Sequence, residues 1–376
     1  MLETGIIGIG NAGSQVAVLA NKRLGIDALV INSSDKDLET IPSGITSILI
    51  GDSNGSGKNR KEAQKFLKGS IASIVTNEDY ANIFSKDVLF VASSTGGGTG
   101  SGASIIMANI VSEISKTTKV IIIGILPTLK EGLSTQLNSI QYLTELYKAL
   151  DGATYMLYDN DKLSKMSSTA MMESINNQIV DDIDVIKGTY QTTTKYSSID
   201  EKDMSNILTT KGRIVIASLR DIKEKDLDET TIEDLLIKQF KTNAHCELQR
   251  DKIVHRTGII TNLSERLNDM IDTHIPKIQE FIGAPVEEYE HIVINTDRHL
   301  PNNVFLICSG LTQVNDRIRK INDRIEEINE LQKHLEEDSE LESVDFEAMS
   351  SKIERKDDGE ASENVDLAWI FSKFNV

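Results

Sequence analysis

The sequence predicts an α/β protein whose N-terminal part is a Rossmann-like, doubly wound parallel sheet. Short β-branched runs alternate with helical patterns across positions 1–165, and strands separated by helices in this way pair in parallel. The predicted strands are Ile6–Ile7, Ala28–Ile31, Ser47–Ile50, Val88–Ala92, Val120–Leu126 and Ala153–Tyr158. The predicted helices between them are Ser14–Arg23, Arg60–Ile74, Gly102–Ser115 and Ser134–Leu150. Such sheets bind ligands at the carboxyl ends of their strands.

A long apolar helix follows this first domain. Apolar residues recur at steps of three and four from Met172 to Ile186, and Gly188 ends the pattern. A smaller α+β domain comes next, with antiparallel strands and helices to one side. Its predicted elements are strands Arg213–Ala217, His291–Asn295 and Val304–Cys308, and helices Thr231–Thr242 and Ser264–Ile282. We therefore expect a ligand-binding domain at 1–165, a central helix at 166–190 and a second domain at 191–312.

The C-terminal segment 313–376 is strongly acidic, with a net charge of −9 from 9 basic and 18 acidic side chains. Apolar residues from Val314 to Ile328 repeat at alternating steps of four and three, which predicts a long helix over 313–343. This helix either packs by one stripe on its own domain or forms a coiled coil. A flexible tail, 344–376, ends in the amphipathic segment DLAWIFSKFNV, which docks on a partner or packs back on the chain.

The composition excludes several classes of protein. Apolar residues make up 39% of the chain, which is enough to build a core. The net charge of −18 argues against direct nucleic-acid binding, since that affinity comes mostly from cationic side chains. The two cysteines, Cys246 and Cys308, suit a reducing compartment. The N-terminus does not resemble a secretory signal, and no apolar run is long enough to cross a bilayer, so we expect a cytoplasmic protein without membrane contact.

Two glycine-rich loops carry the chemistry. The first is Gly8-Ile-Gly10-Asn-Ala-Gly13 between a strand and a helix, and Asp35 follows at the distance typical of a dinucleotide site. The second and richer loop, Ser93–Gly102, also lies between a strand and a helix. A nucleoside triphosphate needs this many backbone N–H donors, whereas a dinucleotide enzyme does not. A third segment, Gly55–Asn59, resembles the end of a Walker loop but lacks its first glycine and its Ser or Thr.

These loops resemble those of the tubulin/FtsZ superfamily. GNAGSQ at 10–15 and GGGTGSG at 96–102 are similar to its two glycine loops, and further segments follow in the family's order. Those segments are Asn32–Asp35, Gly55–Asn59, Pro127–Gly132, Asn160–Leu163, Asn176 in the long helix, and Asp200–Leu208. The length and the acidic final helix resemble the plasmid- and phage-borne TubZ branch. Two departures stand out, because Ser198 replaces an Asn and Thr135 stands where FtsZ carries an Arg.

The resemblance implies that domain 1–165 binds GTP or GDP with Mg²⁺, an ion that keeps much of its hydration. Asn160 and Asn176 would read guanine, because an amide matches both its donors and its acceptor. Which residues contact the metal ion is left open. The implied nucleotide-binding residues are Gly10, Asn11, Ala12, Gly13, Gln15, Asn32, Asp35, Gly57, Thr95, Gly96, Gly97, Gly98, Thr99, Gly100, Glu131, Asn160 and Asn176.

The resemblance also implies that the active site is shared between two subunits. The glycine loops hold no general base, and hydrolysis needs an anionic group to orient the attacking water. Asp203, assisted by Asp200, would reach the γ-phosphate bound by the neighbouring subunit, so activation domain 191–312 completes the site. Such a contact is heterologous and propagates into a head-to-tail homopolymer.

The function expected from these features is a GTPase that forms filaments and drives plasmid or phage DNA partition in a bacterial host. A basic DNA-binding adaptor would bind the acidic helix or the tail. One alternative is an FtsZ-like or phage-centring filament without an adaptor. Two others are a nucleotide-sensing monomer with degenerate catalysis and, from a different class, an NAD-dependent oxidoreductase built on Gly8–Gly13.

Overall fold

The computed structural model describes residues 3–149, 153–189, 206–227, 230–248, 253–264, 267, 275–283, 285–293 and 301–342. The chain divides into two compact units, Met1–Asn322 and Asp323–Val376. Several sequence predictions lie outside the described residues. They are the predicted catalytic segment with Asp200 and Asp203, most of the predicted helix between 264 and 274, and the tail from 343 onward.

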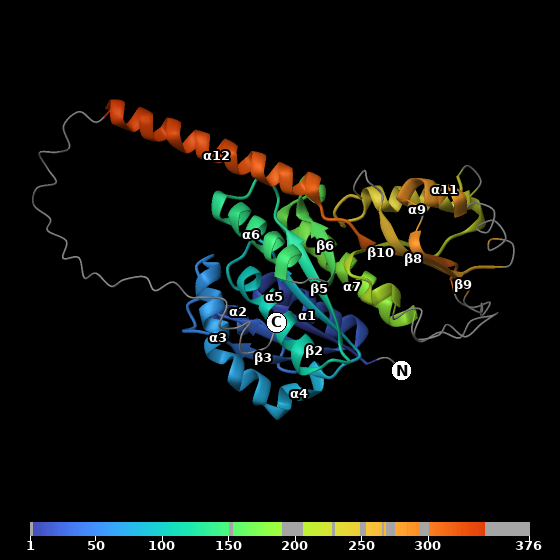
Figure 1. Ribbon diagram of the computed structural model, residues 1–376, viewed down its shortest axis with the longest axis horizontal. Helices are drawn as coiled ribbons and strands as arrows, with labels where there is room; N and C mark the ends of the chain where they lie inside the picture. Colours follow the sequence, from blue (N-terminus) through green and yellow to red (C-terminus); the bar gives the residue numbers. More distant parts are fainter. Residues whose placement is uncertain are drawn as a thin grey trace, which may run out of the picture. The chain divides into compact units, whose positions relative to one another are not determined.

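The first unit is built on one ten-stranded sheet in the order β3-β2-β1-β4-β5-β6-β7-β10-β8-β9 (Figure 1). All pairs from β3 to β7 are parallel, which confirms the predicted α/β fold with a doubly wound sheet. The strands are β1 (Thr4–Ile9), β2 (Asp27–Asn32), β3 (Thr46–Leu49), β4 (Val88–Ser94), β5 (Lys119–Leu126), β6 (Thr154–Asp159), β7 (Gly212–Leu219), β8 (Val254–Asn262), β9 (Pro285–Val293) and β10 (Asn303–Leu311).

Helices and short helical turns lie between these strands, and one further helix follows the last strand. They are α1 (Gly10–Leu24), α2 (Asp35–Leu38), α3 (Arg60–Thr76), α4 (Glu78–Phe84), α5 (Thr99–Ile114), α6 (Leu133–Ala149), η1 (Asn160–Leu163), α7 (Ser168–Thr189), η2 (Glu224–Leu227), α9 (Ile232–Thr242), α11 (Ile275–Ile282) and α12 (Asn315–Glu342). All the helices predicted within 1–165 are present, and the helix pattern through Met172 and Ile186 is α7. Met172 itself is 43% exposed, whereas Ile175, Ile179 and Ile183 are buried.

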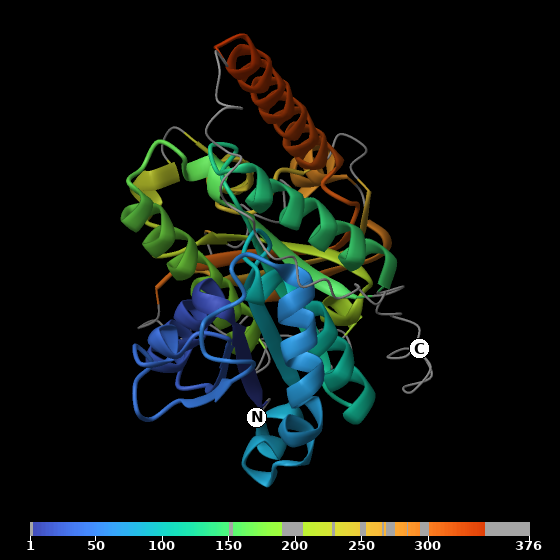
Figure 2. The same cartoon turned by 90° about the vertical axis from the view of Figure 1, so that its left-hand side faces the viewer.

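The central strands are buried on both faces, as parallel strands between helical layers must be. Phe90 and Ile121 belong to the core that α1 and α7 share with the sheet. Leu89 and Val91 alternate with Phe90 along β4, so they face the other side, and they are also fully buried. Helices α3, α5 and α6 pack together in this part of the unit, where Figure 2 shows them side by side. The buried strands fix the loops at their carboxyl ends.

The second half of the sheet differs from the prediction in three ways. Strand β10 is antiparallel to β7 and β8, as expected, but β9 pairs with β8 in parallel. Strand β8 was not predicted, because His255, Arg256 and Gly258 interrupt its apolar run. Strand β9 begins at Pro285, before the apolar stretch on which the prediction rested. Helices α9 and α11 cover one face of these strands (Figure 1), and both contribute to an apolar core with them.

A buried polar cluster fastens α7 to the sheet. The Tyr158 hydroxyl donates to Asp182 Oδ2 at 2.8 Å, and His245 Nε2 lies 2.9 Å from the same oxygen. The rings of Tyr158 and His245 stack with their centroids 4.4 Å apart. Burial raises the pKa of Tyr158 well above its usual value, so this hydroxyl remains a donor. The cluster fixes the position of α7 against β6.

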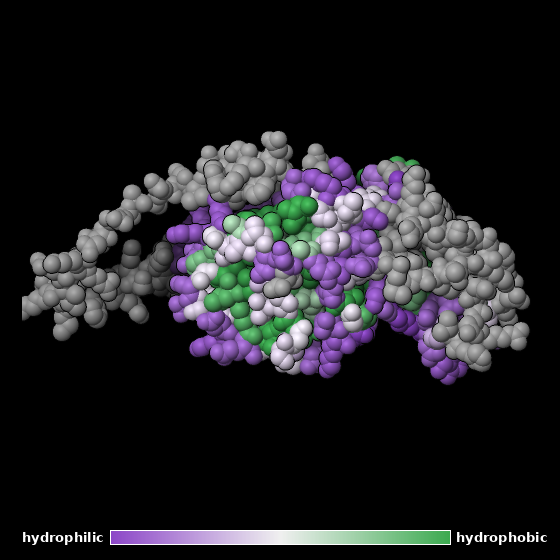
Figure 3. Space-filling view, turned by 90° about the horizontal axis from the view of Figure 1, so that it is seen from below, coloured by the Kyte–Doolittle hydropathy of each residue, from purple (hydrophilic) through white to green (hydrophobic). Residues whose placement is uncertain are grey.

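Two further features of the described residues bear on function. No helix among them is at once long and apolar enough to cross a bilayer. Cys246 and Cys308 are both buried and free. Figure 3 views the molecule from the side on which α4 lies in Figure 1. On this face apolar side chains gather in the middle and polar ones surround them.

Candidate functional site

The two glycine loops meet at the carboxyl ends of β1 and β4. Gly10 follows β1 with φ +70°, a conformation that favours glycine. A Cβ on Gly10 would lie 2.9 Å from the backbone nitrogen of Gly100, and a Cβ on Gly13 would lie 2.1 Å from the carbonyl oxygen of Ala92. The first loop therefore packs closely on the backbone of the second loop and of β4, and the first turns of α1 and α5 come together at one place. Helix N-termini with open N–H groups form a cradle for phosphate.

The second glycine loop is fixed by hydroxyl groups from three other segments. Thr99 Oγ1 lies 2.7 Å from Ser33 Oγ and 3.1 Å from Ser56 Oγ. Thr95 is fully buried, its backbone N–H donates to the Ile125 carbonyl, and its hydroxyl lies 2.7 Å from Ser139 Oγ. Thr95 thus ties the loop to β5 and α6, while Gly96, Gly97 and Gly98 form the turn between β4 and α5. A Cβ on Gly97 would meet nothing within 4 Å, so this residue borders open space.

The loops after β2 and β3 close the same edge of the sheet. Asn32 is buried, and its side chain bonds to Asp37 Oδ2 and to the backbone N–H of Ser33. Asp35 starts α2 and is exposed, and its N–H donates to the Ser53 carbonyl. Gly57 adopts φ +54° in the turn that precedes α3. The structure brings these predicted residues beside the glycine loops through the bonds of Thr99 to Ser33 and Ser56.

The loop after β5 and the turn after β6 are joined. Glu131 Oε1 accepts from the Thr128 N–H at 3.0 Å. Asp161 Oδ1 accepts from the Leu129 N–H at 3.0 Å, which places η1 with its first residue Asn160 beside this loop. Both segments sit at the carboxyl ends of neighbouring parallel strands. This is the position that the resemblance assigns to ribose and base contacts.

A chain of amides links α1 to the long helix. Gln15 Nε2 donates to Asn11 Oδ1 at 3.1 Å, and Asn176 Nδ2 lies 3.5 Å from Gln15 Oε1. Asn11 is exposed and lies in the first turn of α1, next to Gly10 and Ala12. The three amides supply donors and acceptors at the end of the phosphate cradle, a composition suited to a heterocyclic base. The predicted residues Asn11, Gln15 and Asn176 are thus neighbours in space.

The described part of this site presents hydroxyl groups and glycine backbone rather than a cluster of acidic, histidine or cysteine side chains. No group of three or more His, Cys, Asp or Glu side chains comes together within the described ranges. Asp200 and Asp203 lie outside the described residues, so their relation to this cradle stays a prediction.

Sequence reasoning missed four side chains at this edge. Ser33 and Ser56 hold Thr99, and Asn138 Nδ2 lies 3.2 Å from the Gly96 carbonyl and 3.4 Å from that of Gly97. Lys58, which belongs to the failed Walker pattern, donates from Nζ to Thr135 Oγ1 at 3.0 Å. A signal existed only for Lys58, because Ser33 and Ser56 lie in loops, where serine is common, and Asn138 is one polar residue of helix α6.

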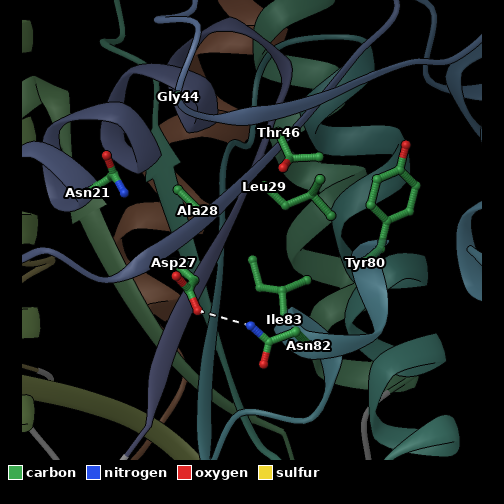
Figure 4. Close-up of a pocket in the computed structure, with 9 residues that line it drawn as sticks. All are labelled: Asn21, Asp27, Ala28, Leu29, Gly44, Thr46, Tyr80, Asn82 and Ile83. Atoms are coloured by element: carbon green, nitrogen blue, oxygen red, sulfur yellow. Dashed lines mark hydrogen bonds between the residues drawn. The ribbon is translucent and has the colours of Figure 1, made fainter. Parts of the chain in front are cut away.

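A separate cavity of about 170 Å³ lies at the amino ends of β2 and β3, beside α4 (Figure 4). Asn82 Nδ2 lies 3.5 Å from Asp27 Oδ2, the contact drawn as a dashed line. Lys86 Nζ pairs with the same oxygen at 2.7 Å. The glycine loops follow the carboxyl ends of β1 and β4, at the opposite edge of the same parallel sheet, so this cavity is not part of their site.

The N-terminal part of the chain is similar in sequence to known proteins. Residues 3–168 match the GTPase domain of the Tubulin/FtsZ family. The tubulin-like protein CetZ of Pyrococcus furiosus is 33% identical over 194 residues, which cover 47% of this chain and 50% of CetZ. The tubulin-like protein TubZ of Clostridium botulinum C phage is 26% identical over 252 residues, 64% of this chain and 66% of TubZ. The chain thus matches only about half the length of the CetZ relative.

Solved structures extend the likeness of the fold beyond the matched domain. A GTPγS-form protofilament of TubZ from Bacillus thuringiensis serovar israelensis superposes with a TM-score of 0.74 at 16% identity, covering 91% of this chain and 95% of that one. TubZ of Clostridium botulinum phage c-st superposes with a TM-score of 0.67 at 20% identity, covering 86% and 97%. At these identities the likeness concerns the fold.

Proposed function

We propose that this chain, whose residues 3–168 match the GTPase domain of the Tubulin/FtsZ family, hydrolyses GTP while it assembles head to tail into filaments. The nucleotide would lie on the two glycine loops, with its phosphates at Gly10–Gly13 and Gly96–Gly100. Mg²⁺ would be held by the phosphates and water. Asn160 and Asn176 would read the guanine, and Glu131 would face the ribose.

The observation that carries this proposal is the contact between the two glycine loops. Gly10 approaches Gly100 so closely that a methyl group would not fit between them. Two helix N-termini and the Ser33–Thr99–Ser56 hydroxyl cluster then converge on one point. A dinucleotide site needs only the first loop, whereas the triphosphate of GTP would also use the backbone N–H donors of the second loop.

The catalytic part of the proposal needs two subunits. Among the described residues, the glycine loops themselves carry no carboxylate or imidazole that could orient water. We assign that role to Asp203, with Asp200 assisting, from the next subunit along the filament. The face shown in Figure 3 supports a head-to-tail contact, because an apolar area within a polar rim is typical of a protein contact surface. GTP would favour the contact and hydrolysis would weaken it.

The biological role that we propose is movement or partition of plasmid or phage DNA through a basic DNA-binding adaptor in a bacterial cytoplasm. Its support is the acidic segment 313–376, whose charge of −9 would attract a basic partner. The 1–343 truncation tests whether the tail serves the adaptor or the polymer. Normal GTP-dependent sedimentation of 1–343 would favour the adaptor, and lost sedimentation would favour a contact with the neighbouring subunit.

Sedimentation and phosphate release measured together test the proposed activity. With GTP, the wild-type chain should pellet and release phosphate, whereas GDP and ATP should support neither. Asp203→Ala should pellet and persist as long-lived filaments with little phosphate release, since the water would lack its orienting carboxylate. Glu201→Ala removes the same charge from the same segment and should behave like the wild type. Wild-type phosphate release from Asp203→Ala would contradict the assignment.

A further inference from the structure

Lys58 lies against the second glycine loop, although its sequence pattern is not a Walker motif. Its backbone has φ +64°, which is unusual for a residue with a side chain. The carbonyl oxygen of Lys58 accepts from Asn138 Nδ2 at 2.9 Å, and the same nitrogen lies 3.2 Å from the Gly96 carbonyl. Asn138 therefore holds the backbone of Lys58 and that of the glycine loop together.

The side chain of Lys58 spans this loop from end to end. A Cβ on Gly98 would lie 2.8 Å from Lys58 Cα, and a Cβ on Gly96 would lie 2.4 Å from Thr135 Cγ2. Lys58 Nζ donates to Thr135 Oγ1 at 3.0 Å. The lysine thus starts beside Gly98 and ends beside Gly96. Between these two glycines lies Gly97, which borders open space.

The ammonium group of Lys58 has a different kind of partner from the guanidinium groups of two nearby arginines. Arg60 is buried and pairs with Glu145 at 2.5 Å, and Arg317 is buried and pairs with Asp159 at 2.8 Å. Lys58 is exposed, and the partner that the structure gives its ammonium is a neutral hydroxyl. A neutral hydroxyl offsets little of a positive charge, so an incoming anion can displace it at small cost.

We infer that Lys58 is a phosphate-binding residue that distinguishes a nucleoside triphosphate from a diphosphate. In the absence of nucleotide the ammonium rests on Thr135, and with GTP it pairs with the terminal phosphate beside Gly97. This inference rests on the proposed function, because it places GTP on the glycine loops. Lys58 would bring a positive charge to the terminal phosphate, whereas Thr135 is neutral and brings none.

The test measures the affinities for GTPγS and GDP by calorimetry at protein concentrations below assembly. Lys58→Met should weaken GTPγS binding by about tenfold or more, because a charge-assisted bond to phosphate is lost, and should change GDP binding by less than about twofold. Lys58→Arg should restore part of the preference for GTPγS. The matched control is Lys61→Met, since Lys61 is an exposed lysine in the first turn of α3. It should change neither affinity.

The possible outcomes separate this inference from the proposed function. Wild-type protein that binds neither guanine nucleotide would overturn both. Wild-type protein that prefers GTPγS, with Lys58→Met keeping the same ratio of affinities, would overturn the role of Lys58 alone. An equal loss of GTPγS and GDP affinity in Lys58→Met would also overturn it, because the contact would then not be with the terminal phosphate.

Discussion

Arg317, at the start of α12, pairs with Asp159 at the end of β6, with Nε 2.8 Å from Oδ2. Both side chains are more than nine-tenths buried, and Arg317 also donates to the Pro127 carbonyl. Pro127 opens the loop that carries Glu131, and Asp159 caps the turn that begins with Asn160. One arginine therefore joins the first turn of α12 to the two loops to which we assign ribose and base contacts.

Removal of this arginine should destabilise the fold in a pH-dependent way. Arg317→Met leaves Asp159 buried without its cation, which should lower the free energy of unfolding by about 3–5 kcal/mol at neutral pH. Burial raises the pKa of Asp159 above its usual value, and Arg317 opposes this rise. Without Arg317 the folded pKa rises further above the unfolded one. The loss of stability should therefore be greatest above the folded pKa and shrink as the pH falls through it.

Urea unfolding of Arg317→Met at several pH values measures this effect. The control is Arg319→Met, because Arg319 pairs with Asp316 on the exposed side of the same helix and should change stability by only about 0–1 kcal/mol. The interpretation fails if Arg317→Met costs the same at pH 5 as at pH 8.

The contact between the two glycine loops can be tested by a substitution that adds one methyl group. Gly10→Ala places a Cβ 2.9 Å from the Gly100 nitrogen at φ +70°, so the loops must separate. GTP affinity should fall by roughly tenfold or more, the effect of about 1.4 kcal/mol. Gly25→Ala is the control, since Gly25 has φ +62° and open space around it. It should cost about 1 kcal/mol of stability and leave GTP affinity unchanged. Equal affinities in the two variants would refute the contact's role.

Base recognition by the amide chain predicts a particular loss of selectivity. Asn176→Ala removes the amide beside Gln15, so GTP binding should weaken by roughly tenfold, the value of one hydrogen bond. ITP lacks the 2-amino group of guanine, and comparison of GTP with ITP shows which edge is read. Asn177→Ala is the control, because its side chain bonds to Arg23 and to the Glu173 carbonyl instead. A loss as large in Asn177→Ala would argue for a general effect on α7.

Neither cysteine should react while the protein is folded. Burial raises the pKa of Cys246 and of Cys308 to about 12, and the thiolate is the reactive form. An aromatic disulfide reagent at pH 8 should therefore titrate no thiol in native protein and both thiols in urea. Rapid reaction of one native thiol would show that its surroundings open readily.

The N-terminal sheet and its loops were predictable because their signals are local. Gly10 needs a positive φ and Gly13 packs against Ala92. The spacing of the glycines therefore indicates the geometry of the loop. Short apolar runs that alternate with helical patterns along the chain indicate buried parallel strands. The same reasoning applies to the pattern through Ile175 and Ile183 in α7, which records the face that packs on α1.

Contacts between distant segments were not predictable. Arg317 and Asp159 lie far apart in the sequence, and neither stands in a pattern that marks it for burial. Ser33 and Ser56 meet Thr99 only because the loops after β2, β3 and β4 come together at one edge of the sheet. The parallel direction of β9 depends on the path of the chain between β8 and β9. The pattern of apolar residues does not indicate this path.

The rate of phosphate release per molecule, measured against protein concentration, tests the central claim most directly. If one subunit binds GTP and the next one supplies Asp203, the rate per molecule should be near zero in dilute solution. It should then rise steeply above the concentration at which the chain begins to pellet. A rate per molecule that stays constant from the most dilute sample to the most concentrated would contradict a site shared between subunits.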